Sequence, residues 1–404
     1  MLISTEHHYY SSVSTFYVQP GSKIMFIGKH RWLLKNEPKG ENGDCLVSME
    51  DLNQLFSPDW TSACENGRVR ITVPGMEIEC TEGSSTVTVK KDVDNRQVDI
   101  KTPVQNVDGQ IYIPVQGFFT AVCGANCAQR DNFYMVSDTK TEIHPKEDFL
   151  HMHNISLDNK KYGYFYEAFW YEPAKRIVPY RLYVPSTYQK GTPQKMIVAL
   201  HGANSDHHVV FERGDGKLAL LAEERGYLIL AVNGLFHRSF YGYCYPTSGG
   251  VNSNFKGPKD NPLQLTDLQF AQRKMSQECV FAQIEKVMED YTIDKDHVYM
   301  MGNSMGGAGT IWLAGQRPQM FKAISPSGGN VSPDYFDVTS IKDVPTLFVV
   351  GTEDEFGACH QDAAAKRFKE GGCDYQMYRV GGGNHSFGWT YALDKSFDFF
   401  DQHQ

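Results

Sequence analysis

The 404-residue chain lacks the features that mark nucleic-acid, membrane and zinc-binding proteins. It has no dense run of basic residues, and its formal net charge of −9 argues against a nucleic acid as the main partner. No apolar stretch reaches the roughly 20 residues that a membrane span needs. The nine cysteines include no C-x-x-C pair, which weakens a zinc-ribbon or thioredoxin interpretation. We predict neither a metal site nor a cofactor.

The first residues also lack a basic region followed by an apolar core, so no secretory signal peptide is visible. On this pattern the protein is either intracellular or numbered from after a removed leader. What the chain does have is 41% hydrophobic and 22% charged residues, which predicts a folded globular protein with a sizeable core. At this length two domains are the better expectation.

The N-terminal part is polar over residues 1–20, which we interpret as a tail, and rich in short alternating runs over residues 21–140. It contains an internal repeat, because residues 45–56 align with residues 111–122 and residues 66–71 align with residues 132–137. Each copy predicts a strand, a short helix and another strand. The sequence therefore predicts a duplicated small α+β domain.

The run Ile111–Val122 and its first copy resemble the copper-amine-oxidase-like N-terminal domain, a module of many bacterial surface and secreted proteins. This resemblance implies a secreted or cell-surface protein whose N-terminal domain contacts a surface, a polymer or a second subunit. A packing or oligomerisation domain is the other interpretation. Residues 141–160 read as a linker, and we interpret its His151 and His153 as surface residues rather than metal ligands.

Residues 161–404 change to alternating strand and helix patterns. A continuous apolar run at residues 196–200 predicts a strand buried on both faces. A long helix is predicted after Thr266, where apolar residues recur at helical spacing. This alternation predicts an α/β domain, with a mainly parallel sheet and helices on both faces.

A G-x-S-x-G sequence, Gly302–Gly306, lies between a predicted strand and a predicted helix. This context is typical of a nucleophile elbow, in which a sharp turn exposes the serine hydroxyl. Ser304 is therefore the candidate nucleophile. The Met305 N–H, at the start of the helix, is placed to bind an oxyanion.

Two other predicted strands end in residues that suit a base and an acid. One runs into Gly351-Thr352-Glu353-Asp354-Glu355, and the other into three glycines followed by Asn384 and His385. The order serine, acid, histidine is that of an α/β-hydrolase. We predict Asp354 as the acid, with Glu353 and Glu355 as solvated turn residues or substrate ligands. The three glycines predict a loop that passes close to other backbone.

The loop after the strand at residues 196–200 supplies the second oxyanion donor in this interpretation. We expect the N–H of Ala203, or that of Gly202, to pair with the Met305 N–H, and His201 to border the site without acting as a second base. The substrate pocket is predicted to be walled by a set of aromatic residues, with a satellite core under a long loop as the alternative. These residues are Phe236, Phe240, Tyr241 and Tyr243, together with Trp389, for which a helix core is the alternative.

The L-H-G-A loop, the G-N-S-M-G-G elbow and the G-G-N-H-S-F-G-W segment resemble the polyhydroxyalkanoate-depolymerase and feruloyl-esterase group of α/β-hydrolases. The resemblance covers about residues 160–404, although the chain shows no separate carbohydrate-binding module. It implies a serine hydrolase that cleaves phenolic esters, acetylated polysaccharides or polyesters through an acyl-enzyme. Two alternatives remain open: a prolyl-oligopeptidase-like serine peptidase, and an inactive hydrolase fold used for adhesion.

Overall fold

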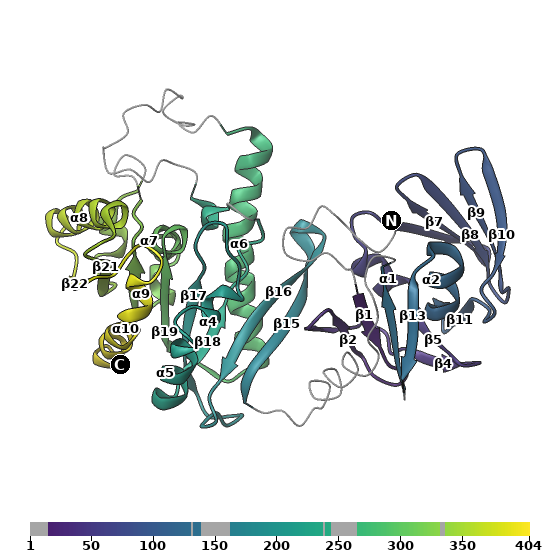
Figure 1. Cartoon of the computed structure of the whole chain (residues 1–404), viewed down its shortest axis with the longest axis horizontal. Coiled ribbons are helices and arrows are strands. Elements are labelled where there is room, and N and C mark those ends of the chain that lie inside the picture. Colours follow the sequence, from purple (N-terminus) through teal and green to yellow (C-terminus); the bar gives the residue numbers. More distant parts are fainter. Residues whose placement is uncertain (1–14, 131, 139–161, 237–238, 244–264, 332–335) are drawn as a thin grey trace. The chain divides into compact units, whose positions relative to one another are not determined.

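The computed structural model describes residues 15–130, 132–138, 162–236, 239–243, 265–331 and 336–404. The chain divides into two compact units (Figure 1). The N-terminal unit comprises Met1–Lys160 and Tyr166–Pro179, and the C-terminal unit comprises Lys161–Phe165 and Tyr180–Gln404. The predicted linker at residues 141–160, with His151 and His153, lies outside the described residues. No helix in the described ranges is long and apolar enough to cross a membrane.

The N-terminal unit is built mainly of antiparallel strands. Five of its strands follow the order β13-β14-β1-β2-β3, five more form a sheet of order β10-β9-β8-β7-β6, and four follow the order β11-β12-β5-β4. The elements are β1 (Thr15–Val18), β2 (Ile24–Ile27), β3 (His30–Leu33), β4 (Lys39–Glu41), β5 (Asp44–Ser48), α1 (Met49–Leu55), β6 (Thr61–Glu65), β7 (Arg68–Val73), β8 (Met76–Thr81), β9 (Thr86–Lys91), β10 (Asp94–Asp99), β11 (Gln105–Val107), β12 (Gln110–Pro114), α2 (Val115–Cys123), β13 (Asn126–Arg130) and β14 (Phe133–Ser137).

Both halves of the internal repeat fold as a strand followed by a helix, β5–α1 and β12–α2, and β5 pairs with β12. Aromatic rings from the two copies of the repeat meet in one core, where the ring centroids of Phe119 and Phe56 are 5.6 Å apart. Phe16 of β1 joins them, 5.4 Å from Phe119 between centroids. The tail prediction is wrong for residues 15–18. These form β1, because the apolar run Thr15–Val18 is buried between β14 and β2.

The C-terminal unit is organised around a sheet of order β16-β18-β17-β19-β20-β21-β22. The first pair, β16 with β18, is antiparallel, and all the following pairs are parallel. The predicted α/β fold is thus confirmed. The strands are β15 (Gly163–Tyr171), β16 (Arg176–Val184), β17 (Gln194–Leu200), β18 (Leu228–Ala231), β19 (Ile293–Asn303), β20 (Ala323–Ser327), β21 (Thr346–Gly351) and β22 (Tyr375–Val380). A 3-10 turn, η1 (Glu172–Ala174), joins β15 to β16.

Helices cover both faces of this parallel sheet. Ile197 and Ala199 of β17 share one apolar cluster with residues of α5 and α10. The side chain of Phe348 on β21 packs instead on Phe368 of α8, with 4.9 Å between ring centroids. The helical elements are α4 (Val209–Glu212), α5 (Lys217–Arg225), η2 (Phe240–Gly242), α6 (Asp267–Asp290), α7 (Met305–Gln316), η3 (Pro318–Met320), η4 (Val338–Ile341), α8 (Glu355–Glu370), α9 (Gly388–Tyr391) and α10 (Leu393–Gln402).

Candidate active site

Ser304 stands at a strained turn between β19 and α7. Its backbone has φ 60° and ψ −116°, a conformation that residues other than glycine rarely adopt. The two glycines of the motif make this turn possible by their small size. A Cβ atom on Gly302 would lie 2.6 Å from the carbonyl oxygen of Gly306, and one on Gly306 would collide with the carbonyl of Leu200. The turn therefore has the geometry of the predicted nucleophile elbow.

The structure brings Ser304, His385 and Asp354 together, and we refer to them as the Ser–His–Asp cluster. Nε2 of His385 lies 2.9 Å from Oγ of Ser304, and Nδ1 lies 2.8 Å from Oδ2 of Asp354. The Asp354 side chain is 4% exposed, whereas that of His385 is 35% exposed. The carboxylate is therefore shielded from water, while the imidazole stays within reach of a ligand.

Asp354 is held in place by the helix that follows it. It is the N-cap of α8, and its Oδ1 accepts a hydrogen bond from the N–H of Gly357 at 2.7 Å. Oδ2 remains directed at His385. An acidic side chain is well suited to cap a helix N-terminus, where backbone N–H groups lack partners. The neighbouring Glu353 and Glu355 are exposed, as their interpretation as solvated turn residues requires.

The loops that carry the acid and the histidine are bonded to each other through backbone. The N–H of Glu353 donates to the carbonyl of Gly383 at 2.9 Å, and the N–H of Thr352 donates to the carbonyl of Val380 at 2.9 Å. A Cβ atom on Gly351 would collide with the carbonyl of Gly383. This is the close approach that the run of three glycines predicts, and it fixes the separation of Asp354 and His385.

A residue that the sequence reasoning left without a role, Asn303, braces the histidine loop. Its side chain is buried, and its Nδ2 donates to the backbone carbonyl of His385 at 3.0 Å. Gly328, after β20, was also missed. A Cβ atom there would lie 3.2 Å from Cε1 of His385 and 3.3 Å from Oδ2 of Asp354. The only sequence signals are an asparagine next to the nucleophile and a Gly-Gly pair after a strand.

The candidate oxyanion donors lie beside Ser304. A Cβ atom on Gly202 would be 3.7 Å from Cβ of Ser304, so the loop after β17 adjoins Ser304. Met305 is the first residue of α7, where backbone N–H groups have no carbonyl partner within the helix. The N–H groups of Met305 and of Gly202 or Ala203 therefore stay the predicted pair of oxyanion donors.

Two of the predicted pocket aromatics belong to the core instead. Tyr241 and Tyr243 are both 0% exposed, which contradicts their assignment to a pocket wall. Tyr241 packs against Gly309 of α7, whose lack of a side chain leaves room for the ring. Tyr243 contacts Trp312 of the same helix at 5.4 Å between ring centroids. The sequence shows aromatic density in this loop but not the glycine-rich helix beneath it.

The other proposed substrate contacts differ in burial. His201 is buried, and its backbone carbonyl accepts a hydrogen bond from the Tyr241 hydroxyl at 2.9 Å. It thus supports the loop of Gly202 rather than reaching a substrate. Trp389 is buried in the core between α10 and the sheet, as the alternative interpretation held. Phe236 and Phe240 are half-buried, and the Arg273 guanidinium lies 4.8 Å from the Phe240 ring centre.

Ser304, His385 and Asp354 follow β19, β22 and β21, at the carboxyl edge of a mainly parallel sheet. The chain has an α/β-hydrolase fold. Residues 269–342, from α6 to η4, match the prolyl oligopeptidase family. This segment includes Ser304 but ends before Asp354 and His385. No curated protein sequence matches the chain.

A search of solved structures found the following three among its matches. An S-formylglutathione hydrolase from Agrobacterium tumefaciens is 16% identical, with a TM-score of 0.46 over 61% of this chain and 97% of that one. A ferulic acid esterase from Anaeromyces mucronatus is 14% identical, with a TM-score of 0.43 over 61% and 93%. A thermostable esterase is 15% identical, with a TM-score of 0.44 over 84% and 97%.

Proposed function

We propose that the protein is a serine hydrolase of carboxylic esters that works through an acyl-enzyme. The observation that carries this proposal is the pair of contacts made by His385, one to Ser304 and one to Asp354. A serine hydroxyl needs a base to become nucleophilic, and the base needs an acceptor that fixes its tautomer. The Ser–His–Asp cluster supplies all three groups in that order.

The reaction proceeds in two steps. Nε2 of His385 takes the Ser304 proton as Oγ attacks the ester carbonyl, and the Met305 and Ala203 amides hold the oxyanion. The bond to the alcohol oxygen then breaks as Nε2 returns the proton to that oxygen. Water attacks the acyl-enzyme by the same route and releases the acid. Throughout, Asp354 accepts the Nδ1–H and stabilises the imidazolium.

For the substrate, we propose phenolic esters of the feruloyl type, acetylated polysaccharides or polyesters, on the resemblance of the loop, elbow and histidine segments. A panel of methyl ferulate, chlorogenate, acetylated xylan and a short polyester separates these classes. A serine peptidase is the second candidate, favoured by the match of residues 269–342 to the prolyl oligopeptidase family. Faster cleavage of a chromogenic peptide than of every ester in the panel would favour it.

Replacing Ser304 with alanine tests the proposed nucleophile. We expect hydrolysis of p-nitrophenyl acetate to fall by 10³-fold or more, because the acyl-enzyme cannot form. A fluorophosphonate probe should label the unmutated chain and not Ser304→Ala. Ser186→Ala, which removes an exposed serine, serves as the matched control and should be labelled normally. Near-normal turnover by Ser304→Ala would refute the assignment.

A further inference from the structure

Phe356 is an exposed aromatic residue in direct contact with the Ser–His–Asp cluster. It lies in the first turn of α8, two residues after Asp354, and is 58% exposed. Its ring centre is 5.3 Å from that of His385, with the planes at 87°, and 4.3 Å from that of His360. Single exposed apolar residues are common on protein surfaces. This one differs because its neighbour is the proposed catalytic base.

In the second half of acylation, when the alcohol leaves, the alcohol part of the ester must lie next to His385. Nε2 must come within about 3 Å of the alcohol oxygen to return the proton to it. The carbon atoms attached to that oxygen then lie next to the imidazole. Because the exposed Phe356 ring contacts the imidazole, we place the ring within reach of the alcohol half of the ester.

The segment that follows His385 also carries exposed aromatic side chains. Phe387, two residues after His385, is 43% exposed, and Tyr391 of α9 is 58% exposed. Their rings are stacked, with 6.3 Å between centroids and 22° between planes. Exposed rings of this kind offer flat faces that pack against other rings and against the C–H groups of cyclic molecules. The segment after His385 therefore presents the same chemistry as Phe356.

We propose that Phe356 is a specificity-determining residue that binds the alcohol half of the substrate and favours esters of ring-bearing alcohols over esters of small alcohols. This inference rests on the proposed ester hydrolysis. The sugar hydroxyls of an acetylated polysaccharide belong to the favoured class, because a sugar ring presents a face of C–H groups. The acyl half, which is retained on Ser304, is not selected by Phe356.

The test compares benzyl acetate with methyl acetate. Both give the same acetyl-enzyme, so deacylation is identical and kcat/KM reports how the alcohol half is accommodated in acylation. In Phe356→Ala we expect the benzyl-to-methyl ratio of kcat/KM to fall about five- to tenfold, the usual size of one aromatic contact. Phe356→Tyr retains a ring and should restore the ratio.

A matched control is Tyr378→Ala, which removes an exposed aromatic ring from β22 and should leave the ratio unchanged. An equal loss on both esters in Phe356→Ala would overturn the inference, because it would mean that the ring acts only by positioning His385. A change in acyl preference, measured with methyl acetate against methyl ferulate, would overturn it as well. If the unmutated chain hydrolyses none of these esters, the proposed function itself fails. If Phe356→Ala retains normal turnover and an unchanged benzyl-to-methyl ratio of kcat/KM, the Phe356 inference is refuted while the proposed ester hydrolysis stands.

Discussion

Asn303 shows how a single buried amide can set the geometry of a site without touching the reacting atoms. It precedes Ser304 in β19, yet its Nδ2 binds the carbonyl of His385, which lies 82 residues further along the chain. The hydrogen bond therefore ties the nucleophile strand directly to the histidine loop. Its effect on hydrolysis should appear in the orientation of the imidazole rather than in substrate binding.

Removing this amide should slow the chemical step. In Asn303→Ala we expect kcat to fall about tenfold, the equivalent of one buried hydrogen bond, with KM nearly unchanged. Asn303→Asp is the matched variant, because an ionised carboxylate has the same shape but donates no hydrogen bond. Steady-state kinetics with p-nitrophenyl acetate give both parameters. A rise in KM with kcat unchanged would contradict the positioning role.

The proposed catalytic residues are easier to predict than the residues that hold them. Ser304, Asp354 and His385 each follow a predicted strand, so the rule that parallel strands end at one edge predicts their convergence. Asn303 and Gly328 could not be found in this way, because their contacts join segments far apart in sequence. The burial of Tyr241 depends likewise on the small residues of α7, which no local pattern connects to the aromatic loop.

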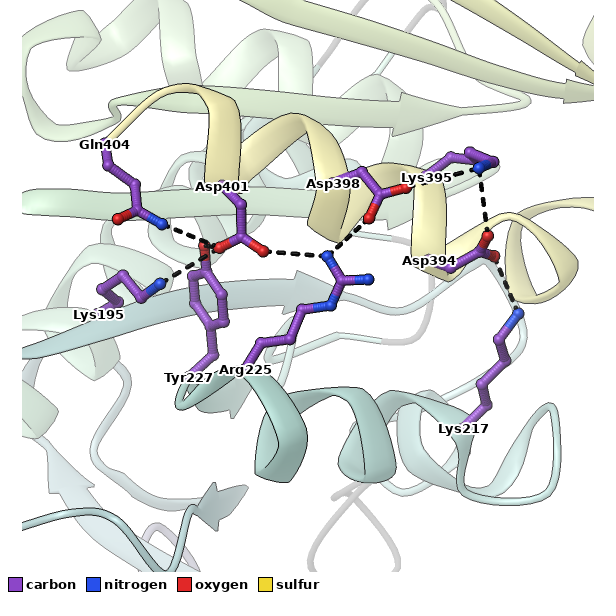
Figure 2. Close-up of polar contacts among 9 residues, drawn as sticks. All are labelled: Lys195, Lys217, Arg225, Tyr227, Asp394, Lys395, Asp398, Asp401 and Gln404. Atoms are coloured by element: carbon purple, nitrogen blue, oxygen red, sulfur yellow. Dashed lines mark hydrogen bonds and ion pairs between the residues drawn. The ribbon is translucent and has the colours of Figure 1, made fainter.

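At the scale of elements, α10 is fastened to the sheet and to α5 by a row of ion pairs (Figure 2). Arg225 of α5 lies between Asp398 and Asp401, at 2.7 Å and 3.0 Å. Asp401 also accepts a hydrogen bond from the Tyr227 hydroxyl at 2.7 Å and pairs with Lys195 at 3.3 Å. The apolar face of α10, with Phe397 and Phe400, is buried beneath this row. The polar row thus fixes the register in which the helix packs.

Burial by itself would raise the pKa of Asp401, but the hydrogen bonds from Tyr227 and Arg225 and the charge of Lys195 outweigh it and leave the pKa below its usual value. A carboxylate whose pKa is lowered by folding stabilises the folded state above its unfolded pKa of about 3.9. That contribution is lost as the pH falls through the lower, folded value. The clamp on α10 therefore operates at neutral pH and fails in acid.

Asp401→Asn tests this clamp. At pH 7 we expect the free energy of unfolding to fall by about 1–2 kcal/mol, because Arg225 and Lys195 lose a charged partner that is partly screened by solvent. The difference between variant and unmutated chain should shrink as the pH is lowered through 3.9 and below. Denaturant unfolding at several pH values measures it, with the exposed Asp374→Asn as the control. A difference independent of pH would show that charge is not its cause.

The sequence predicts where helices lie, but not the side-chain contacts that hold them against the rest of the unit. The apolar spacing after Thr266 predicts α6, and the structure adds the capping box in which Thr266 and Gln269 exchange hydrogen bonds. The pairing of Arg225 with Asp398 and Asp401 joins residues more than 170 positions apart. Charge alone marks these residues as surface residues, which is why the sequence does not reveal the clamp.

At the scale of the whole chain, the two units are not separated by one cut in the sequence. Residues Tyr166–Pro179, the distal part of the β15–β16 hairpin, belong to the N-terminal unit. There β15 pairs with β3 in parallel, and Arg31 binds Glu167 at 2.6 Å. A strand pattern in the sequence does not say which strand of the chain is the partner. The predicted boundary near residue 160 therefore misses that residues Tyr166–Pro179 belong to the N-terminal unit.

A truncated chain that begins at residue 162 should therefore expose apolar surface. Ala168, Trp170 and Ile177 would lose the core against which they pack. We expect this chain to bind a hydrophobic dye and to associate, as measured by fluorescence and size-exclusion chromatography. In a second truncated chain, an Asn-Gly turn also replaces residues 167–178, and this change should suppress both dye binding and association. If the chain that begins at residue 162 stays monomeric and does not bind the dye, the role given to β3 is contradicted.

The glycines that line the site constrain its evolution as tightly as its reactive groups do. At Gly306, Gly351 and Gly357 even a methyl group would collide with a carbonyl or with the Asp354 carboxylate. None of the three has a positive φ, so the requirement for glycine comes from lack of space and not from backbone conformation. A related sequence that keeps this arrangement of Ser304, His385 and Asp354 therefore has almost no freedom of substitution at these positions. The arrangement of the site depends on positions that carry no side chain as well as on the side chains of Ser304, His385 and Asp354.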